Sequence, residues 1–440
     1  MESSTPANET SHPSIFRDRS FWGMTITQFL AVFNDNLYKQ VVVLVCVDIA
    51  LAGGTKGLGG IATIFFTIPF ILLSGFCGYL SDKYSKRTIV VISKIAEVAI
   101  MFLGMLAFLS EKPNIVLMFG VLFLIGVHST LYAPAKYGLL PELFSKRDLP
   151  KVNGLFQMSL FVAIILGLAA AGIAKENWND KLWLVSLVCI VIAVLGFFSS
   201  MLIRRMPAAR PGMAFDRSDL IVNRETRKVL WANKPLLSAL FATSAFWATG
   251  GLVYPLAITD LGRKQFGLSE SFTSYLAAGT GIGIAVGCVI GMLLSHQRFN
   301  ARLVRVGGWG MFLGLLLITI PGAAPNTNML GVAGTAVVLV GLGICAGLYS
   351  VPLQVLIQAK APAEHKGRVI GAMSLANWIG IYFSGMLYSI ASPINAAWNF
   401  PPATLFAIGA VFLSPVLLFY RPQSEDLSDA PQLPETTPSV

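Results

Sequence analysis

The stretch Gly78-Tyr-Leu-Ser-Asp82-Lys83-Tyr-Ser-Lys86-Arg87 lies between two long apolar segments of the chain. It contains one acidic residue followed by a tight group of basic residues. Charged side chains are costly in the hydrocarbon core of a bilayer, and basic residues gather in short loops on one side of a membrane. The stretch therefore predicts a short loop at a membrane surface, between two membrane-spanning helices.

The overall composition agrees with a membrane-embedded chain. Of the 440 residues, 55% are hydrophobic and 12% are charged, and the mean hydropathy is +0.69. A chain with these values is too apolar and has too few charged residues to be a soluble protein of this size. The 5 cysteines all fall inside apolar segments, which argues against disulfides and against a metal site. We expect no cofactor.

Apolar segments of about 20 residues can cross a bilayer as helices. The sequence contains about twelve such segments, and a long polar stretch divides them into two groups of six. The predicted fold is an all-α integral membrane protein with two six-helix halves. The expected parts are an N-terminal segment (1–20), an N-terminal half (21–203), a linker (204–235), a C-terminal half (236–420) and a disordered tail (421–440).

The basic residues are distributed unevenly between the two sides of this predicted bundle. Most of the 32 Lys and Arg residues fall in loops on one side, with a large group in the linker. The positive-inside rule places that side, with both termini, the linker and the tail, in the cytoplasm. The net charge of +10 then reflects membrane topology, with membrane lipids as partners. Nucleic acid is not an expected partner.

The opening stretch resembles the loop between the second and third helices of the major facilitator superfamily, whose pattern is Gly-x-Leu-x-Asp-[Arg/Lys]-x-Gly-[Arg/Lys]-[Arg/Lys]. The two halves also echo each other, because Tyr132 and Tyr349 are as far apart in the sequence as Gly154 and Gly371. The resemblance implies the major facilitator fold and secondary transport, with the substrate site between the halves. The residues that match the loop pattern are Gly78, Leu80, Asp82, Lys83, Lys86 and Arg87.

This loop is the predicted gating element. We expect Asp82 to pair with Arg87 or a nearby cation, and with the positive N-terminal end of a helix in the other half. Lys83 and Lys86 are the remaining gating candidates. Together these contacts would close the cytoplasmic side of the transporter.

Two further motifs resemble the LplT-type family of lysophospholipid transporters. They are Phe33-Asn34-Asp35-Asn36 and Pro134-Ala-Lys136-Tyr137-Gly138-Leu-Leu-Pro141-Glu142, the second followed by Lys151-Val-Asn153-Gly154-Leu155. The resemblance implies a lysophospholipid substrate, carried across the bacterial inner membrane for reacylation. It also implies a cytoplasmic acyltransferase as a partner. Hydropathy and spacing alone imply only a transporter, so a drug or metabolite efflux transporter of the same superfamily is the alternative.

The first predicted span carries the main substrate-binding candidates. Asp35 and Lys39 are four residues apart and share one helix face roughly midway across the membrane. Burying either charge alone is expensive, so we expect them to pair. They form either a fixed internal ion pair or a headgroup site. In the second case Asp35 faces an ethanolamine ammonium and Lys39 the phosphate, while Asn34 or Asn36 bonds ester or glycerol oxygens.

Four more residues complete the candidate site. Lys136 either extends to the membrane interface or contacts the phosphate. The family resemblance implies an Arg in the seventh span, where this sequence has Tyr254. Glu97 is either paired structurally with Lys94 or couples transport to protons. His128 is either a packing residue or a proton relay.

Enzymatic activity is not expected. Glycerolipid acyltransferases use His-x4-Asp, in which the Asp orients the His general base. None of the 4 histidines in this chain is followed by Asp at that spacing. The chain also lacks Gly-x4-Gly-Lys-[Ser/Thr], the phosphate-binding loop of ATP-driven pumps.

Overall fold

The computed structural model describes residues 15–52, 58–110, 113–295, 298–323 and 327–426. Within these ranges it contains 12 helices that are long and apolar enough to cross a membrane. This confirms the predicted all-α membrane fold. The spanning helices are α1 (Arg19–Leu51), α2 (Leu58–Lys83), α3 (Lys86–Leu106), α4 (Ile115–Leu143), α5 (Leu149–Asn177), α6 (Trp183–Met201), α8 (Lys234–Leu252), α10 (Glu270–Ser295), α11 (Ala301–Thr319), α12 (Gly331–Lys360), α13 (Lys366–Ala397) and α14 (Leu405–Phe419).

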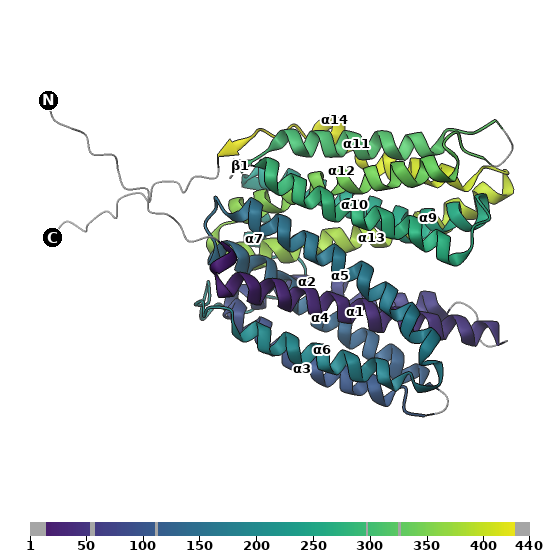
Figure 1. The fold of residues 1–440 in the computed structure, drawn as a ribbon. Coiled ribbons are helices and arrows are strands. Elements are labelled where there is room, and N and C mark those ends of the chain that lie inside the picture. The colour runs from purple at the N-terminus through teal and green to yellow at the C-terminus, as the bar shows by residue number, and fades with distance from the viewer. Residues whose placement is uncertain (1–14, 53–57, 111–112, 296–297, 324–326, 427–440) are drawn as a thin grey trace, which may run out of the picture.

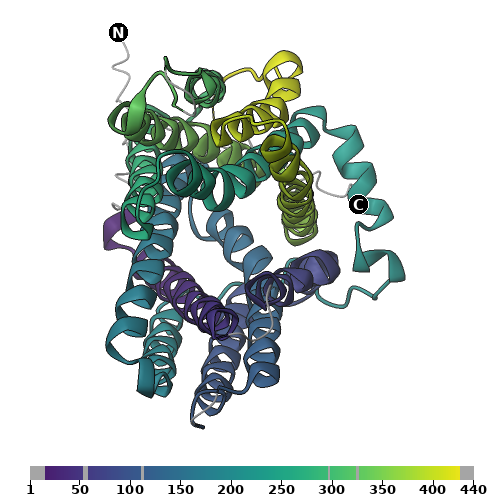
Figure 2. The ribbon, with the colours of Figure 1, turned by 90° about the vertical axis from the view of Figure 1, so that its right-hand side faces the viewer.

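The spanning helices form two bundles that lie side by side (Figure 1). Helices α1–α6 make up the N-terminal half, and α8 and α10–α14 make up the C-terminal half. Figure 2 shows the two groups end-on, with α2, α4 and α5 of the first facing the second. The halves meet mainly where α2 packs on α13 and where α5 packs on α10.

Short elements connect or extend these helices. The linker holds a nine-residue helix, α7 (Arg224–Ala232), and a 3₁₀ turn (Arg217–Leu220). A π-helical turn (Val253–Ala257), α9 (Ile258–Asp260) and a second π-helical turn (Leu261–Gln265) extend α8. The other short elements are 3₁₀ turns at Ile15–Arg17, Asn179–Lys181, Ala363–His365 and Pro402–Thr404, and strands β1 (Arg298–Phe299) and β2 (Glu425–Asp426).

Small residues decide how closely the helices pack within a half. A Cβ atom added to Gly287 of α10 would lie 2.1 Å from the carbonyl oxygen of Ile344 on α12. No side chain other than hydrogen fits there, so the two backbones are in direct contact. Close backbone approach at small residues is a common way for membrane helices to associate, because lipid gives no hydrophobic drive for their packing.

The tail is ordered further than the sequence indicated. Residues 421–426 were expected to be disordered, but Glu425 and Asp426 form β2, which pairs antiparallel with β1. Lys360 Nζ also lies 2.5 Å from a carboxylate oxygen of Glu425. These contacts fasten the first residues of the tail to the end of the C-terminal half. Residues 427–440 lie outside the described part of the chain.

Truncating the chain after Asp426 is expected to leave transport unchanged. Truncation at this point keeps the β1–β2 pairing that fastens the tail to the C-terminal half. The residues removed, 427–440, are rich in Pro, Ser, Thr and acids. The measurement is substrate uptake by cells that contain equal amounts of full-length and truncated protein. A large loss of uptake would contradict this expectation and would give the tail a docking or regulatory role.

Candidate functional site

Asp82 joins the two halves at one end of the bundle. It lies at the end of α2 and is fully buried. Its carboxylate oxygens accept hydrogen bonds from the backbone N–H groups of Gly367 (2.6 Å) and Arg368 (3.1 Å), in the first turn of α13. The free N–H groups and the dipole at a helix start favour a negative charge there. We call this end of the bundle, which carries the Lys83–Arg87 loop and the linker, the basic end.

The contact continues along α2 and α13 toward the middle of the bundle. A Cβ atom on Gly78 would lie 2.8 Å from the carbonyl oxygen of Gly367, so the two backbones touch. One helical turn further, Ser74 and Ser374 place their hydroxyl oxygens 3.5 Å apart. The rings of Phe70 and Trp378 then stack, with centroids 4.1 Å apart. Side chains at four-residue spacing on antiparallel helices thus form one continuous seam, which we call the α2–α13 seam.

A second cross-half contact lies beside this seam. Asn153 of α5 and Gln358 of α12 exchange two side-chain hydrogen bonds, of 2.7 and 3.1 Å. Both side chains are fully buried. A reciprocal amide pair satisfies the buried polar groups and fixes their relative position. The two halves are therefore held together at the basic end by polar as well as apolar contacts.

Arg368 is the cation that faces Asp82, and it also reaches the linker. Its Nε atom lies 3.4 Å from Asp82 Oδ2. Its two terminal nitrogens face Asp219 (3.8 Å) and Glu225 (3.2 Å) of the linker. A hydrogen bond from Arg210 lowers the pKa of Glu225 and so favours its charged form. The linker thus contributes two carboxylates to this network.

A second buried network lies inside the N-terminal half. Glu97 of α3 is 2.5 Å from Lys94 Nζ and accepts a 2.8 Å hydrogen bond from the Asn34 side chain. His128 Nε2 of α4 lies 3.6 Å from the same carboxylate. The Glu97, Lys94 and His128 side chains are all at most 4% exposed. Glu97 therefore has the structural Lys94 partner considered above, and proton coupling through Glu97 or His128 stays a prediction.

Glu97→Gln is expected to destabilise the protein by about 3–5 kcal/mol, because it leaves the Lys94 ammonium buried without a countercharge. The measurement is the midpoint of thermal unfolding of the purified protein in detergent. Glu176→Gln is the matched control, because Glu176 is exposed. An equal midpoint for Glu97→Gln and wild type would contradict the structural role and leave Glu97 as a coupling candidate.

The predicted Asp35–Lys39 ion pair is absent from the described residues. Asp35 Oδ2 accepts a 2.5 Å hydrogen bond from Ser129 of α4, and Asp35 Oδ1 is buried without a hydrogen-bond partner. Lys39 Nζ instead lies 4.9 Å from the ring centroid of Phe66 on α2 and 3.5 Å from Asn36 Oδ1. The two side chains share a helix face but lean toward different neighbouring helices. The four-residue spacing in the sequence does not distinguish an Asp35–Lys39 ion pair from separate partners on neighbouring helices.

The two asparagines beside Asp35 make bonds within the protein. The Asn34 amide donates to Glu97 and to the Cys189 carbonyl oxygen (3.1 Å), and its side chain is fully buried. The Asn36 amide donates to the Val32 carbonyl of its own helix (2.8 Å). Both N–H donors of Asn34 are occupied, so hydrogen bonding of a substrate ester oxygen by Asn34 is not favoured in this conformation. The Asn36 amide makes one such bond within the described residues, which leaves its second N–H for a ligand.

Lys136 lies inside the bundle and does not extend to the membrane interface. It is 7% exposed, and its Nζ atom lies 5.2 and 4.9 Å from the ring centroids of Tyr132 and Tyr137. No carboxylate among the described residues pairs with it. Tyr254 belongs to the π-helical turn after α8, but its side chain lies outside the described part of the structure.

Charged side chains of both signs without an ion-pair partner in the described part of the chain thus lie inside the N-terminal half, and Lys39 is the one close to the Phe70–Trp378 end of the α2–α13 seam. Phe66, the ring under Lys39, is 6.5 Å from Trp378 between ring centroids. Lys39 and Lys136 have no carboxylate partner within the described residues, and Asp35 has no cation. A ligand with one positive and one negative group would satisfy this set of charges.

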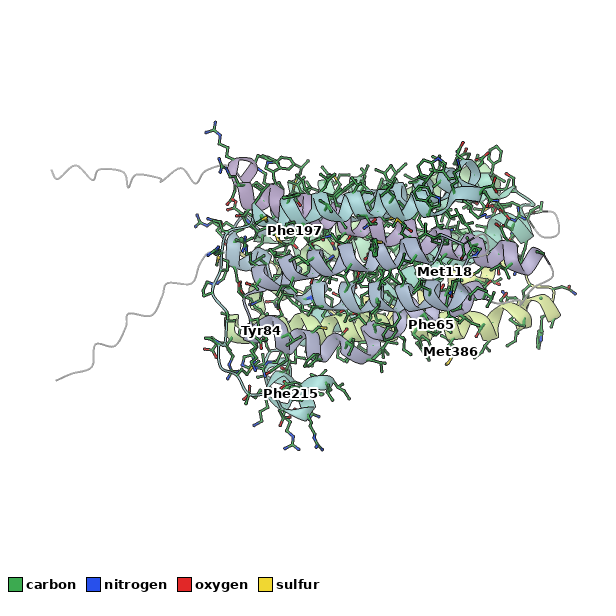
Figure 3. All side chains as sticks on the ribbon, turned by 90° about the horizontal axis from the view of Figure 1, so that it is seen from below. Phe65, Tyr84, Met118, Phe197, Phe215 and Met386 are labelled. Carbon is green, nitrogen blue, oxygen red and sulfur yellow. The ribbon has the colours of Figure 1, made fainter. Side chains whose placement is uncertain are left out.

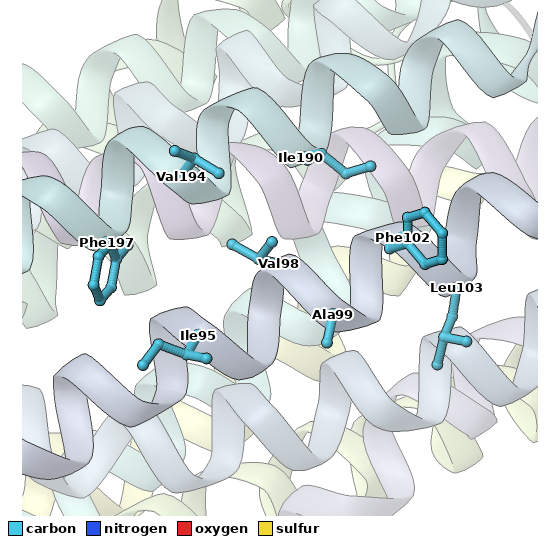
Figure 4. Close-up of a pocket in the computed structure, with 8 residues that line it drawn as sticks. All are labelled: Ile95, Val98, Ala99, Phe102, Leu103, Ile190, Val194 and Phe197. Carbon is cyan, nitrogen blue, oxygen red and sulfur yellow. The ribbon is translucent and has the colours of Figure 1, made fainter.

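An apolar groove on the outer surface is not part of this site. Its volume is about 710 Å³, and it runs between α3 and α6 (Figure 4). Ile95 and Phe102 line it and are more than half exposed, whereas Lys94 and Glu97 point to the opposite face of α3. The groove therefore faces the surrounding lipid.

The family model of the Major Facilitator Superfamily matches residues 24–385. The chain belongs to the major facilitator superfamily. Among curated relatives, the lysophospholipid transporter LplT of Klebsiella pneumoniae subsp. pneumoniae is 25% identical over 407 residues, covering 91% of this chain and 95% of the relative. The lysophospholipid transporter LplT of Yersinia pestis (strain Pestoides F) is 24% identical over 386 residues, covering 86% and 88%.

Solved structures of other facilitators share the fold. A bacterial homologue of the iron transporter ferroportin, in an outward-facing state, superposes with a TM-score of 0.70 at 14% identity, covering 90% of this chain and 98% of that one. The proton:xylose symporter XylE gives a TM-score of 0.71 at 13% identity, covering 91% and 95%. This facilitator is thus a secondary transporter by family, and not an enzyme.

The basic residues of the loop in this facilitator have partners in their own half. Lys83 donates to the Tyr79 hydroxyl (2.9 Å), and Lys86 forms a 2.6 Å ion pair with Glu142. Arg87 donates to the carbonyl oxygen of Ile203 (3.3 Å), so it is not the cation that faces Asp82. The cation that faces Asp82 is Arg368. The nearest signal in the sequence is Gly367-Arg368 at the start of the eleventh predicted span, where Arg368 is one of the many basic residues on that side of the membrane.

Proposed function

We propose that this facilitator moves lysophospholipids across the bacterial inner membrane by alternating access, with the basic end and both termini in the cytoplasm. Support for the substrate class comes from the two LplT relatives, which align with most of the chain. The observation that carries the proposal is the set of charges without an ion-pair partner among the described residues inside the N-terminal half, Asp35, Lys39 and Lys136, of which Lys39 lies near the α2–α13 seam. Support for the orientation comes from the basic loops.

The proposed headgroup site uses those three side chains. Asp35 faces the ammonium group of ethanolamine, and Lys39 and Lys136 face the phosphate. Charge-assisted hydrogen bonds of this kind are roughly twice as strong as neutral ones. The acyl tail needs only apolar surroundings, which the spanning helices supply along their length. A midplane site between the halves is how transporters of this architecture bind their substrates.

The α2–α13 seam is the proposed cytoplasmic gate. The Asp82–Arg368 contact at the end of this seam is what we call the latch. Closing it leaves the site accessible from the opposite side of the membrane, and opening it exposes the site to the cytoplasm. Lys83, Lys86 and Arg87 are proposed to hold the loop that carries Asp82. A cytoplasmic acyltransferase that consumes the delivered lysophospholipid is the proposed partner.

Uptake of labelled lysophosphatidylethanolamine by spheroplasts tests the substrate class. Cells that lack lysophospholipid transport should take up the label several times faster when they contain this protein. Equal uptake with and without the protein would contradict the proposal. The competing function, efflux of a drug or metabolite, would instead lower the accumulation of such compounds in the same cells.

A further inference from the structure

The linker forms a strap across the basic end. Residues 206–232, which we call the strap, are bound to α2 and the following loop: Ser85 donates to the Met206 carbonyl (2.6 Å), and Arg210 N–H donates to the Asp82 carbonyl (2.9 Å). Phe215 packs edge-on against Tyr79, with centroids 5.4 Å apart. The strap is therefore fixed to the transporter along its length.

The strap lies at the flank of the bundle. Figure 3 shows Phe215 on a segment that projects sideways near the basic end, beside the helices and not beyond their ends. Its neighbours Leu220 and Ile221 are 45% and 67% exposed, and Phe215 is 48% exposed. In a membrane, a segment that projects sideways from the bundle near its basic end is surrounded by lipid at the membrane surface. Large apolar side chains so placed would be costly in water.

Helix α7 presents one basic and aromatic face. Arg224, Arg227, Lys228 and Trp231 have the i, i+3, i+4, i+7 spacing of a single helix face, and all four are exposed, Trp231 at 72%. The opposite face is packed against the protein through Thr226 and Leu230, both buried. Three cations around a Trp are typical of helices that lie in the headgroup region, where Trp is enriched and anionic lipid attracts Lys and Arg.

We propose that the exposed face of α7 docks on anionic phospholipid headgroups of the surrounding bilayer. Arg224, Arg227 and Lys228 contact lipid phosphates, Trp231 enters the headgroup region, and Leu220 and Ile221 reach the acyl boundary. The positive charge matches the anionic leaflet that faces the cytoplasm. The docked segment is the one whose Asp219 and Glu225 contact Arg368.

The test measures contact between Trp231 and lipid. The full chain is reconstituted into bilayers of phosphatidylcholine alone or with added phosphatidylglycerol, with brominated acyl chains that quench Trp fluorescence. The fluorescence of Trp231 is obtained by subtracting, for each protein, the Trp fluorescence of the same protein with the Trp231→Phe substitution. Phosphatidylglycerol is expected to increase the quenching of Trp231.

The double variant Arg224→Gln/Arg227→Gln should lose this increase. Each cation near an anionic surface favours binding about fivefold, so removing two should lower the ratio of docked to undocked α7 about twenty-five-fold. The matched control is Arg302→Gln/Arg305→Gln, which removes two exposed arginines of α11 and should keep the full increase.

Three results would overturn the proposal. The first is equal quenching of Trp231 with and without phosphatidylglycerol. The second is the same increase in quenching for the α7 and α11 double variants. The third is that Trp231 is not quenched in either of the two bilayers. The last result would assign the face to a soluble partner. None of them depends on which substrate is transported.

Discussion

Asp82→Asn is expected to lower the rate of lysophosphatidylethanolamine uptake about tenfold or more, at near-normal expression. The carboxylate accepts two backbone hydrogen bonds from the start of α13 and faces Arg368. The side-chain amide of the variant has no negative charge, and its NH₂ group would face the backbone N–H groups of α13 and the Arg368 guanidinium, which are donors themselves. Removing one partner from a buried pair costs about 3–5 kcal/mol. Because this cost falls on the state in which the basic end is closed, that state loses population.

The measurement is uptake at matched protein levels, with Asp180→Asn as the control. Asp180 is an exposed carboxylate at the opposite end of the bundle, so its variant should transport normally. A normal rate for Asp82→Asn would remove the latch from the proposed mechanism.

Asp35→Asn is expected to reduce uptake of ethanolamine lysolipids by about tenfold to a hundredfold more than uptake of glycerol lysolipids. Asp35 is buried, has no cation within the described residues and has one carboxylate oxygen without a partner. An ammonium group would be its countercharge, and losing one side of such a desolvated pair typically costs several kcal/mol. Glycerol headgroups carry no ammonium, so they lose much less.

Parallel uptake assays with the two labelled lysolipids give this ratio directly. Asp48→Asn is the matched control, because Asp48 lies on the same helix but its side chain is largely exposed. An equal fall for both substrates in a folded Asp35→Asn protein would make Asp35 structural and would leave the headgroup assignment without its anion.

The fold was predictable because its signals are local. Twelve apolar segments of bilayer length predict twelve spanning helices. The Gly78–Arg87 stretch resembles a loop of one superfamily, whose family model matches residues 24–385. The start of the tail was predicted wrongly because Glu425 and Asp426 are ordered only through pairing with residues 298–299. A two-residue strand has no periodicity that the sequence could reveal.

The sequence indicated which charged residues lie inside the N-terminal half, but not which neighbours each of them contacts. The helical spacing of Asp35 and Lys39 placed both on one face, yet Ser129 and Phe66 of neighbouring helices determine where each side chain lies. Such choices depend on tertiary packing, which overrides the weak preference of residues four apart for each other.

Arg368 was missed for the same reason. Asp82 and Arg368 are far apart in the sequence, and nothing local shows that α2 and α13 meet. The helix start that Asp82 faces was predicted by physical reasoning, because an anion in this position needs backbone N–H groups. The identity of the cation required the structure.

A disulfide across the α2–α13 seam tests alternating access most directly. Ser74 and Ser374 face each other at 3.5 Å between hydroxyl oxygens, so Ser74→Cys/Ser374→Cys should form a disulfide on oxidation, in a background where Cys77 is replaced by Ser. The oxidised protein is expected to lose lysophosphatidylethanolamine uptake and to regain it on reduction, while each single-cysteine variant transports in both conditions. Full uptake by the cross-linked protein would show that the basic end need not open, and would contradict the proposed mechanism.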